Sequence, residues 1–254
     1  MTITHDVAGD GPAVVLVHST VCDRRMWDPQ VPALTAAGYL VVRCDLRGFG
    51  DSPVPDGPYD NARDVLDVLD LLAIEKTALI GSSGGGRVSL ELAARWPHRV
   101  YALALLCGAV ADHEPSEELR AFGGREDELL EAGDVEGATE LNVATWLGPY
   151  ADDATRAHVR RMQRHAFEVQ LAATEEFPPV RTPVELSAVT APSLVVAGRH
   201  DLIDFREIAS RLAAGLPGSR HVELDWAGHL PSLERPEVVN DLLLDFLADT
   251  RPSH

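Results

Sequence analysis

The stretch from Thr77 to Gly86 constrains this chain more than any other, because it compresses three kinds of local structure into a few residues. A short apolar run over 77–80 ends abruptly in the turn Gly81-Ser82-Ser83-Gly84-Gly85-Gly86, and a helical pattern follows over 87–96. A strand, a sharp turn and a helix in this order can hold one turn residue in a strained backbone conformation, with its side chain projecting from the tip.

Glycine spacing singles out Ser83 as that projecting residue. Residues two before and two after it crowd each other, so both need to lack a side chain. Gly81 and Gly85 bracket Ser83 at these offsets, whereas Ser82 does not have glycine at both of its own. Ser83 is therefore the candidate nucleophile.

A phosphate-binding turn or a plain glycine-rich loop is the alternative interpretation of this stretch. No Gly-Lys-Ser/Thr follows the turn, which argues against a P-loop, and a G-x-G-x-x-G fingerprint is also absent here. The nucleophile interpretation is favoured.

Charge narrows the range of partners. The chain of 254 residues carries a formal net charge of −18, and Lys76 is its one lysine. An acidic chain without a basic run repels phosphate backbones and anionic membranes, so we expect neither nucleic acid nor a membrane as partner. The expected partner is a small-molecule substrate, and we expect a monomer or a homodimer.

Cysteine usage and the first residues indicate the compartment. Cys22, Cys44 and Cys107 are widely spaced and odd in number, which argues against a disulfide framework and favours a reducing compartment. The start of the sequence has no basic segment followed by an apolar one, and no apolar run approaches the roughly 20 residues of a membrane span. We expect a cytoplasmic, soluble protein.

Strands and helices alternate over most of the chain. Apolar, β-branched runs predict buried strands at 13–17, 39–44, 77–81, 100–106, 193–197 and 220–224, with a weaker first strand at 2–7. Helical patterns are predicted near 26–38, 60–74, 85–96 and 205–212 and from Pro236 onward. The fold class is therefore α/β, with a mostly parallel sheet and helices on both faces.

The alternation breaks between residues 111 and 185, where no convincing strand is found. Helical stretches rich in Glu, Ala and Leu are predicted at 116–132, 135–146 and 152–175. A long insertion at the carboxyl edge of a sheet is a natural lid. We therefore predict an α/β core of residues 1–110 and 186–254, with a helical lid of residues 111–185.

A serine nucleophile needs a base within hydrogen-bond reach and a group that fixes the tautomer of that base. Functional groups collect at the carboxyl ends of parallel strands, so the candidates are the residues that follow the late strands. Asp201 follows the apolar run at 194–197, and His229 follows Leu224 in a glycine-containing loop.

These features together resemble the α/β-hydrolase family of the serine type, over about residues 10–248. The chain order of Ser83, Asp201 and His229 is that of the family. The other matching motifs are His18-Ser19-Thr20, Asp45-x-Arg47-Gly48-x-Gly50-x-Ser52, Gly198-x-x-Asp201 and Gly228-His229. Within the family, the segment from Asp23 to Gln30 resembles the 3-oxoadipate enol-lactonase-like branch.

The resemblance implies a role for each matching residue. Ser83 would be the nucleophile, His229 the general base and then acid, and Asp201 the orienting carboxylate. The oxyanion hole would use the backbone N–H groups of Thr20 and Gly84. The first turn departs from the family pattern, since the usual His-Gly is His18-Ser19 here.

Other side chains compete for some of these roles. His200 is an alternative base, and Asp112 is an alternative acid because some family members place the acid after the strand at 100–106. His18 is expected to brace the oxyanion turn, and Asp45 and Arg47 are expected to hold loops together. His158 and His165 have no ligand partner at metal-binding spacing, so we expect no metal and no cofactor.

Four bulky or polar side chains are candidates for the substrate pocket: Trp27, Asn142, Trp146 and Phe167. Structural packing is the favoured interpretation for Trp27 and the alternative one for Trp146 and Phe167.

The resemblance implies a serine hydrolase that cleaves a carboxylic ester or lactone through an acyl-enzyme. C–C bond hydrolases, thioesterases and perhydrolases use the same triad and are alternatives. The C–C hydrolases tend to have Asn before the nucleophile and Met after it, whereas Ser82 and Gly84 stand there in this chain. A second alternative is a ligand-binding homologue with little turnover, which need not keep all three triad groups.

Overall fold

The computed structural model describes residues 2–175 and 177–251. Within them seven strands form one sheet in the order β1-β3-β2-β4-β5-β6-β7. The strands are β1 (His5–Ala8), β2 (Ala13–Val17), β3 (Leu40–Cys44), β4 (Thr77–Ser82), β5 (Val100–Leu106), β6 (Ser193–Gly198) and β7 (Arg220–Leu224). β1 runs antiparallel to β3, and the other neighbours are parallel. The predicted α/β fold class is confirmed.

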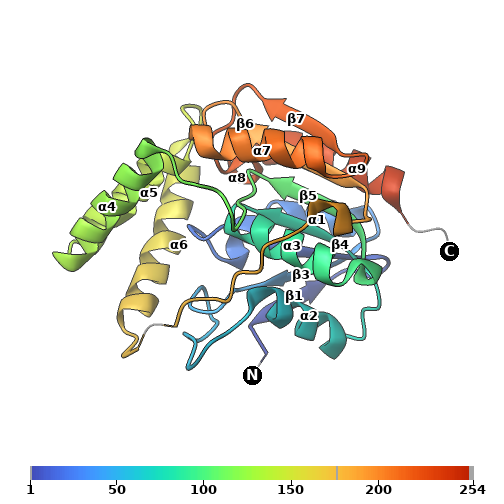
Figure 1. Ribbon diagram of the computed structural model, residues 1–254, viewed down its shortest axis with the longest axis horizontal. Coiled ribbons are helices and arrows are strands. Elements are labelled where there is room, and N and C mark those ends of the chain that lie inside the picture. The colour runs from blue at the N-terminus through green and yellow to red at the C-terminus, as the bar shows by residue number, and fades with distance from the viewer. Residues whose placement is uncertain (1, 176, 252–254) are drawn as a thin grey trace.

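Helices cover both faces of this sheet (Figure 1). On one face α1 (Gln30–Ala36) packs against α9 (Pro236–Thr250), and on the other face lie α2 (Asn61–Leu71), α3 (Gly84–Arg95) and α7 (Ile203–Gly215). The short elements are η1 (Arg24–Trp27), η2 (Pro97–Arg99), η3 (Leu186–Ala188) and α8 (Pro231–Glu234).

The central strands are apolar throughout because both of their faces are covered. Every residue of β2, β4, β5 and β6 is buried. The edge strand β7 instead exposes Arg220, His221 and Glu223. Because β4, β5, β6 and β7 are parallel neighbours, the loops at their carboxyl ends meet at one edge of the sheet.

Between β5 and β6 the described residues form three α-helices, which we call the inserted helices: α4 (Glu117–Glu131), α5 (Val135–Trp146) and α6 (Asp153–Leu171). They lie together at one side of the sheet, with α5 in contact with both α4 and α6 (Figure 1). Each begins at a residue whose side chain accepts a hydrogen bond from the first turn, namely Ser116, Asp134 and Asp152. Their function as a lid stays a prediction.

Helix α6 is fastened to the loops of the amino-terminal half. The ring of His165 hydrogen-bonds the Gly50 carbonyl at 3.0 Å, and the Gln170 amide donates to the Gly48 carbonyl at 3.1 Å. The ring of His158 bonds the Arg25 carbonyl at 3.2 Å. Both histidines therefore serve to dock the inserted helices.

Asp204 fastens the start of α4 to the start of α7. Its carboxylate is fully buried and accepts hydrogen bonds from the Ser116 backbone N–H at 2.7 Å and the Ser116 hydroxyl at 2.6 Å. The His113 ring lies 2.8 Å from the same carboxylate. Although burial alone would raise the pKa of Asp204, the hydrogen bonds from Ser116 and His113 hold it below its usual value.

Replacing Asp204 with asparagine is expected to lower the free energy of unfolding at pH 7 by about 1–3 kcal/mol, because an amide cannot accept all of these bonds. A lowered carboxyl pKa stabilises the fold above the unfolded value of about 3.9 and stops doing so as the pH falls through the folded value. Thermal unfolding should therefore separate wild type from Asp204→Asn at pH 7, and the separation should shrink at a low pH well below about 3.9.

Asp241→Asn, at an exposed position of α9, is the control and should change the unfolding free energy by less than about 0.5 kcal/mol. An Asp204→Asn deficit of the same size at both pH values would contradict this account of the carboxylate.

The structure differs from the sequence prediction mainly at element boundaries. The helix expected near 26–38 is divided into η1 and α1, with Pro29 standing between them. The third inserted helix ends at Leu171, short of the expected 175. Helix α8 was not predicted, because four residues are too few to show a periodic pattern.

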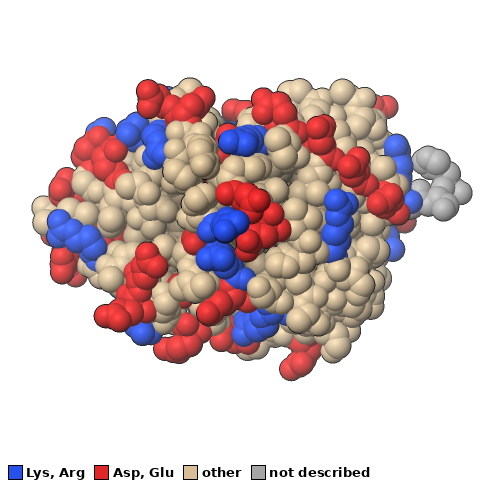
Figure 2. Space-filling model, turned by 90° about the horizontal axis from the view of Figure 1, so that it is seen from above, with Lys and Arg blue, Asp and Glu red and all other residues tan. Residues whose placement is uncertain are grey.

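All three cysteines are buried and free, as expected from their spacing. On the face shown in Figure 2, acidic side chains and arginines lie side by side, and no continuous basic area spans it. No helix in the described part of the chain has the length and apolar character needed to cross a membrane. The expected partners, oligomeric state and compartment stay predictions.

Candidate active site

The turn after β4 holds Ser83 in a conformation that L-residues rarely adopt. Its dihedral angles are φ 52° and ψ −119°. Its backbone carbonyl and N–H groups both form hydrogen bonds. The Ser83 N–H donates to the Leu106 carbonyl at 3.0 Å, and the Ala109 N–H donates to the Ser83 carbonyl at 2.9 Å. The loop after β5 thus holds the strained residue in place.

The glycines that bracket Ser83 are sterically required. A Cβ on Gly81 would lie 2.4 Å from the Gly85 carbonyl oxygen, and a Cβ on Gly85 would lie 2.3 Å from that of Val17. The neighbouring Ser82 is fully buried, and its hydroxyl has no hydrogen-bond partner within the described residues. The spacing argument for Ser83 therefore matches the geometry of the turn.

Asp201 and His229 are brought together from the loops after β6 and β7. The Nδ1 atom of His229 lies 2.7 Å from Oδ2 of Asp201, and both side chains are almost fully buried. The other carboxylate oxygen accepts the Leu202 N–H at 2.8 Å. An ionised carboxylate can only accept, so Nδ1 carries the proton and Nε2 is left free to act as a base.

Two aromatic rings confine the His229 imidazole. The Phe205 ring on α7 lies 4.2 Å away and the Trp146 ring at the end of α5 lies 4.6 Å away, centroid to centroid. The His229 N–H also donates to the Trp146 carbonyl at 3.0 Å. The inserted helices therefore contact the candidate base directly.

Cys107 lies under the same pair of residues. It follows β5 with φ 47°, and its sulfur lies within 4.8 Å of the potential ligand atoms of Asp201 and His229. Among the described residues, these three side chains form the group whose spacing could hold a metal ion. Two of its members, His229 and Asp201, are already hydrogen-bonded to each other. Burial raises the pKa of the Cys107 thiol well above its usual value, so the thiol stays protonated at neutral pH.

The two predicted oxyanion donors lie together. A Cβ on Gly84 would lie 2.6 Å from the Thr20 side chain, so the first turn of α3 touches the turn after β2. Across the described part of the structure, neither the Thr20 N–H nor the Gly84 N–H has a protein acceptor. Gly84 also stands at the amino end of α3, where the helix dipole favours negative charge.

His18 braces the turn that carries Thr20. Its Nδ1 lies 2.8 Å from the Ser19 carbonyl, and its Nε2 lies 2.9 Å from the Leu46 N–H. Nδ1 must therefore carry the proton and Nε2 must accept. Burial lowers the pKa of His18, which agrees with a neutral ring.

Ser19 stands where the family has glycine, and the structure shows why this is tolerated. Among the described residues other than glycine, positive φ angles occur at Ala73, Ser83 and Cys107 and not at Ser19. The Ser19 N–H faces the sulfur of Met26 at 3.3 Å. The turn therefore does not need the backbone freedom of glycine.

The alternative acid and base lie elsewhere. Asp112 pairs with Arg211 on the surface, with their closest atoms 2.8 Å apart. His200 is exposed, and its ring lies 6.0 Å from that of Tyr150. Among the described residues, neither side chain makes a hydrogen bond or ring contact with His229 or Asp201.

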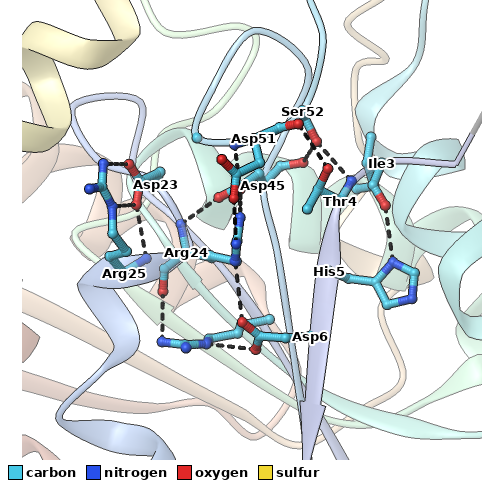
Figure 3. Close-up of polar contacts among 12 residues, drawn as sticks. Ile3, Thr4, His5, Asp6, Asp23, Arg24, Arg25, Asp45, Asp51 and Ser52 are labelled. Atoms are coloured by element: carbon cyan, nitrogen blue, oxygen red, sulfur yellow. Dashed lines mark hydrogen bonds and ion pairs between the residues drawn. The ribbon is translucent and has the colours of Figure 1, made fainter.

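Loop-holding contacts surround Asp45, as predicted (Figure 3). Its buried carboxylate accepts the Arg24 N–H at 2.7 Å and the Asp51 N–H at 2.9 Å, and it also pairs with the Arg24 guanidinium. Arg47 makes a two-pronged ion pair with Asp64, both contacts being 2.7 Å long. The contacts of Asp45 tie the loops after β2 and β3 together, and the Arg47–Asp64 pair ties the loop after β3 to α2.

The four candidate pocket residues have different environments. Trp27 has 0% of its surface exposed and belongs to the main core, which favours packing over substrate contact. Trp146 covers His229, and its indole N–H donates to Asn142 at 2.9 Å. Phe167 is buried on α6, outside the main core cluster.

Sequence reasoning missed Phe205 and Cys107 as neighbours of the triad, and it missed Glu234. Phe205 was predicted only as part of the helical pattern at 205–212. The Glu234 carboxylate accepts hydrogen bonds from the loop that carries His229. No sequence pattern pointed to it, because its hydrogen-bond partners are backbone groups.

Comparison with known proteins identifies the family to which this chain belongs. The model of the alpha/beta hydrolase family matches residues 14–242, which is most of the chain and includes all three candidate triad residues. The chain belongs to the alpha/beta hydrolase family. Hydrolase activity is the general function that this membership supports.

Relatives of this alpha/beta hydrolase are named for the cleavage of different bonds. A Variovorax paradoxus protein named as a carbamate hydrolase, RutD, is 33% identical, with 98% of this chain and 97% of that one covered. A 2-hydroxy-6-oxononadienedioate/2-hydroxy-6-oxononatrienedioate hydrolase of Cupriavidus pinatubonensis is 28% identical, covering 96% and 90%. The enol-lactonase structure from Burkholderia xenovorans LB400 superposes with a TM-score of 0.80 at 27% identity, covering 97% and 96%.

Proposed function

We propose that this alpha/beta hydrolase cleaves a carboxylic ester or lactone through an acyl-enzyme on Ser83. The observation that carries the proposal is the strained serine at φ 52°, which stands at the amino end of a helix. The buried His229–Asp201 hydrogen bond of 2.7 Å supports it. Such strain costs about 1–3 kcal/mol and persists at functional sites.

In the proposed reaction, the Ser83 hydroxyl attacks the carbonyl carbon of the substrate while Nε2 of His229 takes the hydroxyl proton. Asp201 keeps the proton on Nδ1 and stabilises the imidazolium that forms. The carbonyl oxygen becomes an oxyanion, which the N–H groups of Thr20 and Gly84 bind. Each such donor contributes about 3 kcal/mol to transition-state stabilisation.

The tetrahedral intermediate then collapses, and the alkoxide leaves with the proton from His229. In a lactone the leaving oxygen remains tethered to the acyl group. Water next attacks the acyl-enzyme, with His229 again taking a proton, and the carboxylic acid is released from Ser83. The proposal needs no metal and no cofactor.

The inserted helices are proposed to act as the lid over this site. Trp146 covers the imidazole of His229, and it is proposed to contact the leaving group. Asn142 fixes the indole and is proposed to act on the substrate through Trp146. Phe167 is proposed to line the acyl side.

Carbamate hydrolysis is a second candidate, favoured by the relative of 33% identity that is named for it. The same serine would form a carbamoyl-enzyme. A panel of p-nitrophenyl acetate, p-nitrophenyl butyrate, a small enol-lactone, an alkyl carbamate and a vinylogous 1,5-diketone distinguishes these reactions.

We expect kcat/KM to be highest for an ester or the lactone. A carbamate preference of more than tenfold would replace the first proposal by the second. Turnover restricted to the diketone would indicate a C–C hydrolase. Stoichiometric acylation without release would indicate the low-turnover binding homologue.

A further inference from the structure

A carboxylate lies buried beneath the loop that carries His229. Glu234 ends helix α8 and is 8% exposed. Within residues 2–175 and 177–251, no lysine, arginine or histidine forms an ion pair with it. A buried carboxylate without a counter-cation must find several hydrogen-bond donors, and here the donors are backbone N–H groups.

These donors flank the candidate base on both sides. Both oxygens of Glu234 lie 3.0 Å from the Gly228 N–H nitrogen, and Oε1 lies 3.3 Å from that of Leu230. The N–H of His229 donates to the Trp146 carbonyl at 3.0 Å. Three successive N–H groups of the loop are therefore held, two of them by one carboxylate.

The same carboxylate reaches the end of helix α5. A Cβ on Gly148 would lie 2.5 Å from Oε2 of Glu234 and 2.6 Å from the Gly228 nitrogen. A Cβ on Gly228 would in turn lie 2.3 Å from the Gly148 nitrogen. The exit of α5 and the His229 loop are thus packed backbone to backbone around the Glu234 carboxylate.

Two opposing effects act on the pKa of the Glu234 carboxyl. Burial raises the pKa of Glu234, and the N–H groups of Gly228, Gly148 and Leu230 act in the opposite direction. A desolvated carboxylate is held here by backbone donors that converge from the His229 loop and the end of α5.

We propose that Glu234 is a positioning residue for the reaction: its carboxylate fixes the backbone on both sides of His229 and joins that loop to the end of α5. This inference rests on the proposed role of His229 as base. Asp201 orients the imidazole ring of His229, whereas Glu234 fixes the position of the backbone that carries His229. A displacement of about 1 Å at a reacting group can lower a rate by about 100-fold.

The test compares wild type with Glu234→Gln, which keeps the shape of the side chain but turns an NH2 group toward backbone donors. We expect kcat for p-nitrophenyl acetate to fall about 10- to 100-fold, with KM within about threefold. Active sites are counted with a phosphonate, so that kcat refers to folded, reactive enzyme. Glu223→Gln, an exposed position on β7, is the matched control and should keep wild-type kcat.

A second readout does not depend on turnover. The proton on Nδ1 of His229, hydrogen-bonded to Asp201, should give a downfield proton NMR signal that the Asp201→Asn variant identifies by its loss. We expect this signal to be sharp in wild type and Glu223→Gln, and broadened or shifted in Glu234→Gln. The amide spectrum of the β-sheet should be unchanged in all of them.

An unchanged kcat per active site in Glu234→Gln would overturn the proposal, because the residue would then be only structural. If wild type neither turns over esters nor reacts with the phosphonate, the proposed function fails instead. The NMR comparison then decides alone: a changed His229 signal supports the positioning role, and an unchanged one overturns it.

Discussion

Replacing Ser83 with alanine is expected to lower kcat for p-nitrophenyl acetate by about 10⁴-fold or more, which is close to the assay background. The reason is chemical, because no other group in the described site can form the acyl-enzyme in the same position. KM is expected to change little, since the hydroxyl contributes to the reaction more than to binding. Stopped-flow measurement should also show that the initial burst of p-nitrophenolate disappears.

Ser82→Ala is the matched control for this experiment. The Ser82 hydroxyl is buried without a hydrogen-bond partner in the part of the chain that the structure describes, so its loss should leave kcat within about threefold of wild type. The opposite pattern, with Ser82→Ala inactive and Ser83→Ala active, would show that the wrong serine has been assigned.

Replacing Gly85 with alanine is expected to destabilise the native fold strongly. The added Cβ would lie 2.3 Å from the carbonyl oxygen of Val17 and 2.4 Å from that of His18. Both are backbone atoms between a central strand and the turn that carries Thr20, so moving either one would disrupt the surrounding structure. We expect a loss of about 3 kcal/mol or more in the free energy of unfolding, measured by urea denaturation.

Gly123→Ala provides the contrast within the same chain. Gly123 lies inside α4, and a Cβ there would meet nothing within 4 Å. Alanine should therefore raise the unfolding free energy by up to about 1 kcal/mol, through helix propensity alone. Equal effects at both positions would mean that the turn is not under the steric constraint described.

The sequence patterns predicted the sheet and the candidate triad for physical reasons that can be named. Strands such as β5 are buried on both faces, so they appear as unbroken apolar runs. The steric need for glycine at 81 and 85 makes the turn visible in the sequence. Asp201 and His229 follow strand ends, where parallel strands bring their loops to one edge.

Other features of the site could not be predicted from the sequence, because they depend on how distant segments meet. Trp146 covers His229 only because the end of α5 packs against the loop after β7. Glu234 lies in a helix too short to be recognised, and its partners are backbone groups that carry no sequence signal. By contrast, packing was the favoured interpretation for Trp27, and its side chain is buried in the core.

The central claim, that Ser83 is the nucleophile, is tested most directly by covalent labelling. The enzyme is treated with a p-nitrophenyl phosphonate, digested, and analysed by peptide mass spectrometry. The account predicts one phosphonyl group per chain, attached to Ser83, and no label once His229 is replaced by alanine. Stoichiometric label on Ser82 or outside the turn, or full ester turnover by an unlabelled enzyme, would contradict it.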